Sequence, residues 1–129
     1  MARETVVVTG AAAGLGRAIA RAFGQRGVNV GLLARGAEGL NGAAREIEAA
    51  GGAALVLPTD VADAAAVERA AAAVEDRLSP IDIWVNCAMA TIFAPFAKLA
   101  PEEFRLATEV SYLGYVYGTM AALRRMVPR

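Results

Sequence analysis

A glycine-rich segment near the start of the chain has the composition of a loop that binds a phosphate group. Thr9 to Gly16 follows a run of β-branched residues, Thr5 to Thr9, and precedes apolar residues at helical spacing. In such a loop Gly10 permits a tight turn off a strand, Gly14 leaves space for a diphosphate beside the backbone, and Gly16 lets the next helix pack closely. The free N–H groups and the helix dipole would face the anion, so the segment predicts a dinucleotide site.

The alanines of this segment favour the same interpretation, because they leave the loop apolar and unobstructed. A flexible turn in an alanine-rich protein is the alternative, but a strand before the loop and a helix after it favour the phosphate site. The residues expected to contact the cofactor in this loop are Gly10, Ala12, Ala13, Gly14, Leu15 and Gly16.

The end of the second predicted strand bears on which nicotinamide cofactor would bind. That strand, Val28 to Ala34, is followed directly by Arg35. In dinucleotide-binding folds a carboxylate here binds the ribose 2′-hydroxyl of NAD, whereas an arginine accommodates the 2′-phosphate of NADP. The last residue of the strand is Ala34 and not an acidic residue, and Arg35 can pair with a phosphate. The sequence therefore favours NADP(H). The alternative is that Arg35 is an ordinary solvated loop charge.

Predicted strands and helices alternate along the whole chain. Besides the segments above, the pattern predicts helices over 15–26, 38–50 and 63–78, strands over 53–57 and 81–87, and one long helix opening at Pro101. Alternation of this kind predicts right-handed parallel crossovers. We therefore expect an α/β fold, a Rossmann-type doubly wound parallel sheet in strand order 3-2-1-4. Residues 1–129 would form one such domain, truncated before a fifth strand.

Composition excludes several other classes of protein. The chain is 57% hydrophobic and 20% charged with a formal net charge of zero, which argues against disorder and against nucleic-acid binding. No apolar run could span a bilayer, and Met1 to Glu4 does not resemble a secretory signal, so we expect a soluble protein with no membrane partner. The single cysteine, Cys87, suits a reducing cytoplasm, and without histidine no metal site is expected.

With these residues in view, the chain resembles the first half of a short-chain dehydrogenase/reductase. Thr9 to Gly16 is similar to that family's TGxxxGxG loop, Asp60-Val61 to the pair that contacts the adenine ring, and Asn86-Cys87-Ala88 to its Asn-Asn-Ala-Gly motif. The resemblance implies that Asp60 accepts a hydrogen bond from the adenine amine and that Asn86 and Ala88 line the cofactor. Without the family, Asp60 would fit a turn or capping residue.

The resemblance also implies an activity, hydride transfer between NADP(H) and a small carbonyl or alcohol substrate, usually in a homo-oligomer. Two residues depart from the family pattern. Met89 replaces a glycine, which we expect to narrow the groove near the nicotinamide ribose or to change the turn. Ser111 stands where an asparagine supports a proton-relay water, so the relay is either rebuilt with a hydroxyl or absent; it is the one catalytic candidate.

The family's catalytic serine and Tyr-x-x-x-Lys pair are not found in this sequence. None of the three tyrosines is followed by a lysine four positions later: after Tyr112, Tyr115 and Tyr117 stand Val116, Thr119 and Ala121. We expect these tyrosines to pack against another helix or subunit instead. Cys87 beside the cofactor could react, although a buried cysteine is usually a small core hydrophobe.

Two functions therefore stay open. In the first, these residues are the cofactor-binding half of an oxidoreductase whose catalytic residues lie elsewhere. In the second, they are a non-catalytic nucleotide-binding or interaction module. The predicted strand from Ile81 to Val85 would be an apolar sheet edge, so we expect a fragment of a longer protein that self-associates when isolated.

Overall fold

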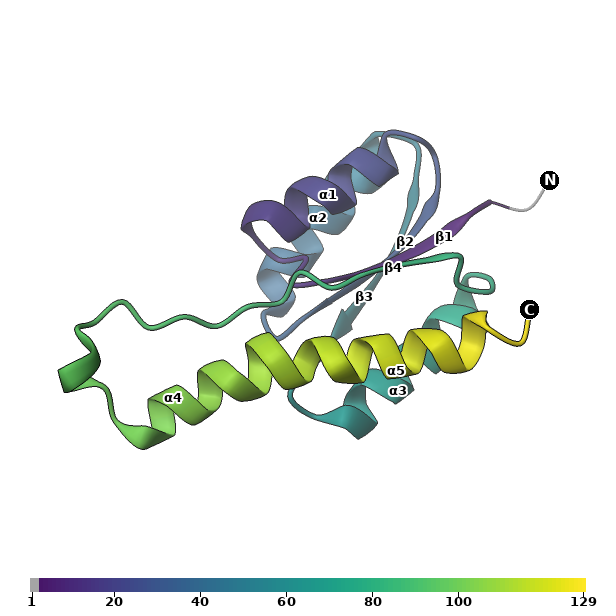
Figure 1. Ribbon diagram of the computed structural model, residues 1–129. Helices are drawn as coiled ribbons and strands as arrows, with labels where there is room; N and C mark the ends of the chain where they lie inside the picture. The colour runs from purple at the N-terminus through teal and green to yellow at the C-terminus, as the bar shows by residue number, and fades with distance from the viewer. Residues whose placement is uncertain (1–2) are drawn as a thin grey trace.

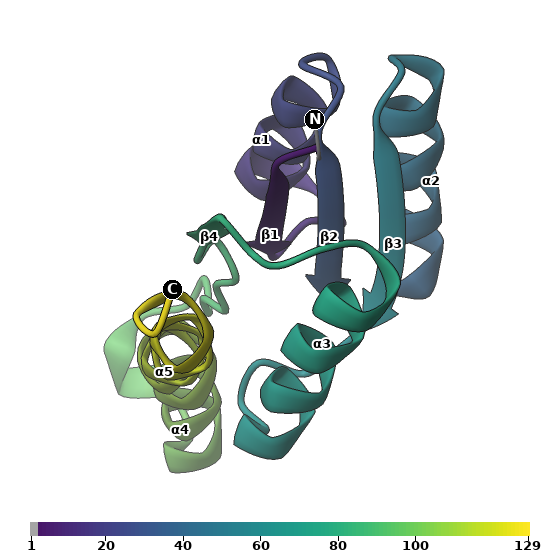
Figure 2. The same cartoon turned by 90° about the vertical axis from the view of Figure 1, so that its right-hand side faces the viewer.

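The computed structural model describes residues 3–129, so Met1 and Ala2, part of the segment considered as a possible leader, lie outside the described residues. Four parallel strands form one sheet in the order β3-β2-β1-β4, which confirms the predicted fold class (Figure 2). The strands are β1 (Thr5–Thr9), β2 (Asn29–Ala34), β3 (Ala53–Pro58) and β4 (Ile83–Val85).

Helices cover both faces of this sheet (Figure 1). On one face lie α1 (Gly14–Gly24) and α2 (Ala37–Ala49), and on the other lie α3 (Ala64–Arg77) and α5 (Gly114–Met126). Every residue of β1 is buried, and its side chains alternate between the two cores, with Val6 and Val8 toward α1 and α2 and Val7 toward α3. Among residues 3–129, no helix has the length and apolar character that a membrane crossing requires.

The fourth strand is shorter than the predicted 81–87, and a side chain explains why. Its ladder with β1 covers only Ile83–Val85. Beyond that point the N–H groups of Cys87 and Ala88 donate to the hydroxyl of Thr9, at 2.9 and 3.1 Å, instead of to a backbone carbonyl. The chain therefore stays beside the end of β1 after the regular strand has ended.

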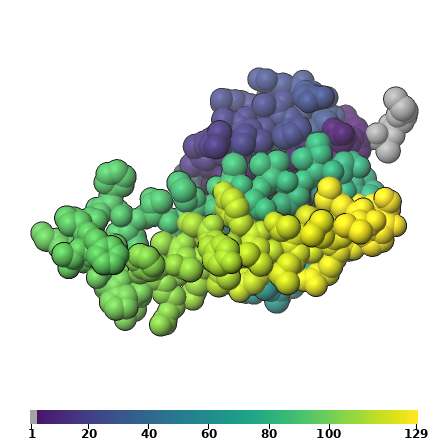
Figure 3. All heavy atoms as spheres, viewed as in Figure 1, coloured from purple at the N-terminus to yellow at the C-terminus, as the bar shows by residue number. Residues whose placement is uncertain are grey.

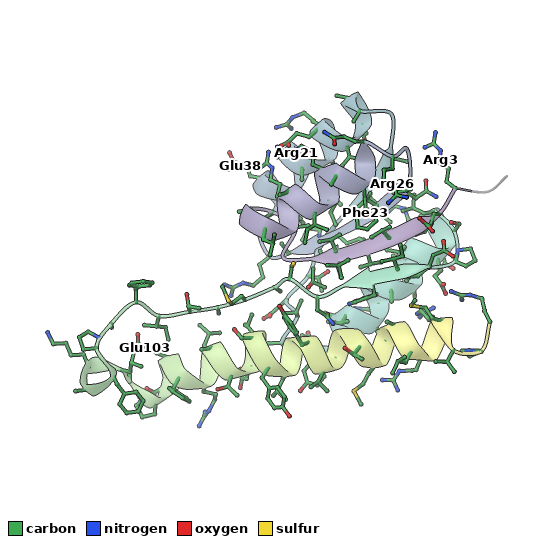
Figure 4. All side chains as sticks on the ribbon, turned by 45° about the horizontal axis from the view of Figure 1, so that its top comes forward. Arg3, Arg21, Phe23, Arg26, Glu38 and Glu103 are labelled. Atoms are coloured by element: carbon green, nitrogen blue, oxygen red, sulfur yellow. The ribbon has the colours of Figure 1, made fainter. Side chains whose placement is uncertain are left out.

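The helix predicted from Pro101 is interrupted in its middle. An α-helix, α4 (Pro101–Thr108), passes through a π-helical segment, η2 (Glu109–Leu113), before α5 begins. At the start of α4, the Glu103 carboxylate accepts the backbone N–H of Ala100 at 3.0 Å (Figure 4). Only this half of a capping box can form, because alanine has no side-chain acceptor.

Between β4 and α4 the chain runs out from the sheet as an exposed arm, residues 89–100, which ends in the short 3₁₀ turn η1 (Phe96–Lys98) (Figures 1 and 3). The rings of Phe96 and Phe104 meet edge to face, 6.2 Å between centroids, and so fasten the turn to α4.

Glu75 on α3 ties the end of α5 to α3 and to the segment that leads into β4. Its carboxylate accepts the Ile81 N–H at 2.8 Å and contacts Arg125 and Arg129 at 3.0 and 3.1 Å. Burial opposes ionisation of this group, but the Ile81 N–H and the two arginines outweigh it and hold the pKa of the Glu75 carboxyl below its usual value.

Removal of the Thr9 hydroxyl should weaken the fold. Thr9→Val keeps the shape of a side chain that is 1% exposed but leaves two N–H groups without their acceptor. We expect the free energy of unfolding in urea to fall by about 2 to 4 kcal/mol, whereas Thr9→Ser, which keeps the hydroxyl, should lose less. A valine variant as stable as the wild type would contradict this account.

Candidate functional site

The glycine loop between β1 and α1 has the backbone conformation that its sequence suggested. Gly10 and Gly14 have left-handed φ angles of 67° and 57°. A Cβ atom at Gly10 would lie 2.8 Å from the backbone N and Cα of Ala88, so only glycine lets the two strand ends meet here. Around Gly14, by contrast, a Cβ would meet nothing within 4 Å, and the loop is open at that point.

Gly16 allows a close approach of α1 to the end of β1 and the turn that follows it. A Cβ there would overlap the carbonyl oxygen of Gly10 and lie 3.2 Å from that of Thr9, so the missing side chain lets α1 pack closely against both. The helix starts after Ala13, whose side chain offers no cap. The first N–H groups of α1 are therefore left for water or a ligand.

A groove crosses the carboxyl end of the sheet in front of this loop. Its larger part, a hollow of about 450 Å³, is lined by the glycine loop together with Ala34, Cys87, Met89 and Tyr115. Its smaller part, about 140 Å³, is lined by residues that follow the other strands: Arg35, Thr59, Asp60, Val61, Ala88, Ala90 and Val110. Both parts share Gly10, Ala34 and Met89, so they form one continuous depression.

The structure brings together most of the residues that the sequence singled out. Those of the glycine loop border the larger hollow, namely Gly10, Ala12, Ala13, Gly14, Leu15 and Gly16. Those from the ends of the neighbouring strands border the smaller one, namely Arg35, Asp60, Val61 and Ala88.

Arg35 and Asp60 are the charged groups of the smaller hollow. Arg35 is exposed and makes no ion pair with any of residues 3–129. One oxygen of Asp60 accepts the Ala62 N–H at 3.0 Å, which is the turn interaction foreseen for this aspartate. Asp60 therefore serves the turn and borders the hollow at the same time.

Asn86, which is expected to line the cofactor, has both polar groups of its side chain engaged by neighbouring residues. Its carbonyl oxygen accepts the indole N–H of Trp84 at 2.9 Å, and its amide donates to the Thr119 hydroxyl on α5 at 3.2 Å. Asn86 borders neither part of the groove because these contacts hold it on the α5 side of the sheet. Gly118 of α5 makes room for this arrangement, because a Cβ there would overlap the Asn86 side chain.

Comparisons with known proteins give the fold a family. Residues 4–129 match the family described as short chain dehydrogenase. This chain belongs to that family. It is 36% identical over 127 residues to 3beta-hydroxysteroid dehydrogenase 1 of Eggerthella lenta, covering 98% of this chain and 49% of the relative.

Solved structures of short chain dehydrogenases agree with the fold. An actinorhodin polyketide ketoreductase variant with NADPH superposes with a TM-score of 0.89 at 35% identity, covering 97% of this chain and 49% of that one. The alcohol dehydrogenase of the archaeon Thermococcus sibiricus, complexed with 5-hydroxy-NADP, gives a TM-score of 0.86 at 32% identity, covering 95% and 53%. The chain thus spans about half the length of these relatives.

Ser111, at the asparagine position of the short chain dehydrogenases, makes a reciprocal contact. Its hydroxyl lies 3.0 Å from both the backbone nitrogen and the backbone oxygen of Ala90, accepting from one and donating to the other. Since a hydroxyl has one hydrogen, Ser111 has no further proton to donate while it holds this segment. Ser111 lies in η2, so these two hydrogen bonds join the π-helical segment to the start of the arm.

Met89, at the glycine position of the family motif, is 70% exposed and borders both parts of the groove. It also borders a third hollow of about 370 Å³, which is lined by Phe104, Ser111 and Tyr112 among others. Met89 therefore stands where the groove meets the space between the arm and α4.

The tyrosines of the last helix divide between core and surface. Only Tyr117 packs against the core under the sheet, whereas Tyr112 and Tyr115 are 64% and 39% exposed. Packing of all three against another helix is thus not found within residues 3–129.

Loss of the Ser111 hydroxyl should loosen the segment that carries Met89. In Ser111→Ala we expect amide hydrogen exchange at Ala90 to accelerate about tenfold, as for a lost hydrogen bond of about 1.4 kcal/mol. Thr108→Ala is the control, because that hydroxyl bonds only the Phe104 carbonyl of its own helix. Unchanged exchange at Ala90 in mass spectrometry would contradict the assignment.

Proposed function

We propose that these residues are the cofactor-binding half of an NADP(H)-dependent oxidoreductase that interconverts a carbonyl compound and an alcohol. The observation that carries the proposal is Arg35, a cation without an ion-pair partner in residues 3–129, beside Asp60 in the groove that begins at the glycine loop. A 2′-phosphate would give this guanidinium its counter-charge.

The groove suits a dinucleotide along its whole length. The open space at Gly14 and the uncapped start of α1 suit a diphosphate, which backbone N–H groups bind without a cation. Asp60 and Val61 border the end next to Arg35, where an adenosine with its 2′-phosphate would lie. The other part of the groove, beside Cys87 and Tyr115, is left for the nicotinamide.

The chemistry divides between the cofactor and the protein. When bound, the nicotinamide ring supplies or accepts the hydride. The residues of this chain bind and orient it, and Ser111 acts as a positioning residue that holds Ala90, since its hydrogen is committed to that carbonyl. The relatives' names refer to a hydroxysteroid dehydrogenase, a ketoreductase and an alcohol dehydrogenase, which supports a carbonyl or alcohol substrate.

The proposal extends to the oligomeric state of the protein and to the compartment in which it is found. We propose a homo-oligomer, in which a second copy covers the exposed apolar side chains of α5, Met120 and Leu123. A single free cysteine suits a reducing cytoplasm.

Substitution of Arg35 tests the choice of cofactor. Because Arg35→Ala removes the partner of the 2′-phosphate, we expect the Kd for NADPH to rise about tenfold to a hundredfold while the Kd for NADH stays unchanged. Fluorescence titration measures both. Arg45→Ala, which removes an exposed arginine of α2 outside the groove, is the matched control. Tighter binding of NADH than of NADPH by the wild type would contradict the proposal.

Turnover tests the reaction class separately. The whole protein containing these residues should consume NADPH in the presence of small ketones or aldehydes and produce it from alcohols, followed at the absorbance of the reduced nicotinamide. NADPH binding with no turnover across a broad panel would reject the oxidoreductase and keep the nucleotide site.

A further inference from the structure

We infer that Arg17 and Glu46 form a brace behind the glycine loop that holds the loop in its diphosphate-binding position. This inference rests on the proposed function. Arg17 follows the loop directly, and its Nη1 donates to the backbone carbonyl of Ala12 at 3.3 Å. Its Nε donates to Glu46 of α2 at 2.8 Å, and its Nη2 donates to the same carboxylate oxygen.

The hydrogen bond from Arg17 to the Ala12 carbonyl bears on diphosphate binding because it affects which way this peptide group points. A loop that binds a diphosphate must turn its N–H groups toward the anion, and a carbonyl oxygen turned the same way would repel it. Ala12 borders the groove, and Arg17 holds its carbonyl by a charge-assisted hydrogen bond. Arg17 thus fixes the orientation of a peptide group within the loop.

Arg17 itself is a positioning residue and not a phosphate ligand. It borders neither part of the groove, and its guanidinium is engaged by Ala12 and Glu46. The hydrogen bond from Arg17 is the main reason that the pKa of Glu46 lies below its usual value, against the opposing effect of burial, so the carboxylate stays charged. The side chains of Arg17 and Glu46 are 33% and 29% exposed, so water screens the pair only in part.

Two glycines of α2 make room for the brace. A Cβ at Gly39 would lie 2.9 Å from the carbonyl oxygen of Ala12, and a Cβ at Gly42 would lie 2.8 Å from Nη2 of Arg17. Glycine in a helix costs about 1 kcal/mol relative to alanine, so these positions give up helix stability while letting α2 approach the loop.

Arg21 provides a matched control within the same cluster. It contacts the other oxygen of Glu46 at 3.1 Å, its side chain is 53% exposed, and unlike Arg17 it donates no side-chain hydrogen bond to the loop. Its substitution removes one cation from Glu46, as that of Arg17 does, but leaves Ala12 held.

The first experiment compares two ligands in the whole protein. In Arg17→Ala we expect the Kd for NADP⁺ to rise about tenfold, while the Kd for adenosine 2′-monophosphate, which lacks the diphosphate, changes less than twofold. Arg17→Lys keeps the charge but cannot reach Ala12 and Glu46 with one planar fork, so it should recover only part of the affinity. Arg21→Ala should bind both ligands as the wild type does.

The second experiment uses Gly42→Ala, which removes no charge. The added Cβ should displace Arg17 and raise the Kd for NADP⁺ several-fold, although the better helix former keeps the Tm equal or raises it. Asn41→Ala, on the exposed side of the same helix, should leave the Kd unchanged. If Gly42 served only the stability of the fold, the loss of affinity in Gly42→Ala would be accompanied by a fall in Tm.

The outcomes separate this inference from the proposed function. Wild-type binding of NADP⁺ together with unchanged affinity in Arg17→Ala and Gly42→Ala overturns the brace and leaves the NADP site standing. An equal loss of affinity for NADP⁺ and for adenosine 2′-monophosphate also overturns it, because the defect would then not be confined to the diphosphate. A wild-type protein that binds neither ligand rejects the proposed function and the brace with it.

Discussion

The groove depends on the close approach of the end of β1, at Thr9, to the chain that follows β4, at Ala88. The Thr9 hydroxyl takes the two N–H groups that β4 no longer pairs, and Gly10 lets the backbones come within contact distance. From this point the chain leaves β1 toward α1 on one face of the sheet, and it leaves β4 through the arm toward α5 on the other face. Divergence of this kind at the carboxyl ends of parallel strands is where open α/β sheets form their ligand crevices.

Much of this arrangement could be predicted from the sequence because it follows from periodicity and from glycine. A wholly apolar run such as β1 can be buried on both faces only in a parallel sheet covered by helices. The glycine loop was recognisable because Gly10 and Gly14 need left-handed backbone, which few other residues adopt. The Asp63 cap of α3 was also predictable, and its carboxylate accepts the Ala66 N–H at 3.1 Å.

The features that could not be predicted depend on side-chain contacts between distant segments. Nothing local shows that the Thr9 hydroxyl will end β4, or that Asn86 will turn to Trp84 and α5. Likewise, the sequence does not show which residue requires the glycine within β2. A Cβ at Gly31 would lie 2.7 Å from the side chain of Val74 on α3. The π-helical segment was hidden because it interrupts no apolar pattern: α4 and α5 continue one another across it (Figure 1).

Under the proposed function, the distribution of charge would let the site both bind a dinucleotide and favour NADP over NAD. Thr9 to Gly16 carries no charged side chain, so the loop can bind an anion only through its backbone, which treats NAD and NADP alike. Charges stand only at its borders, with Arg17 neutralised by Glu46 behind the loop and Arg35 without an ion pair in the described chain. A buried cation beneath the diphosphate would add affinity for every nucleotide, whereas a cation at the 2′ position adds affinity for one. Selectivity therefore requires that the arginine nearest the loop be paired and the one farther away be left for the ligand.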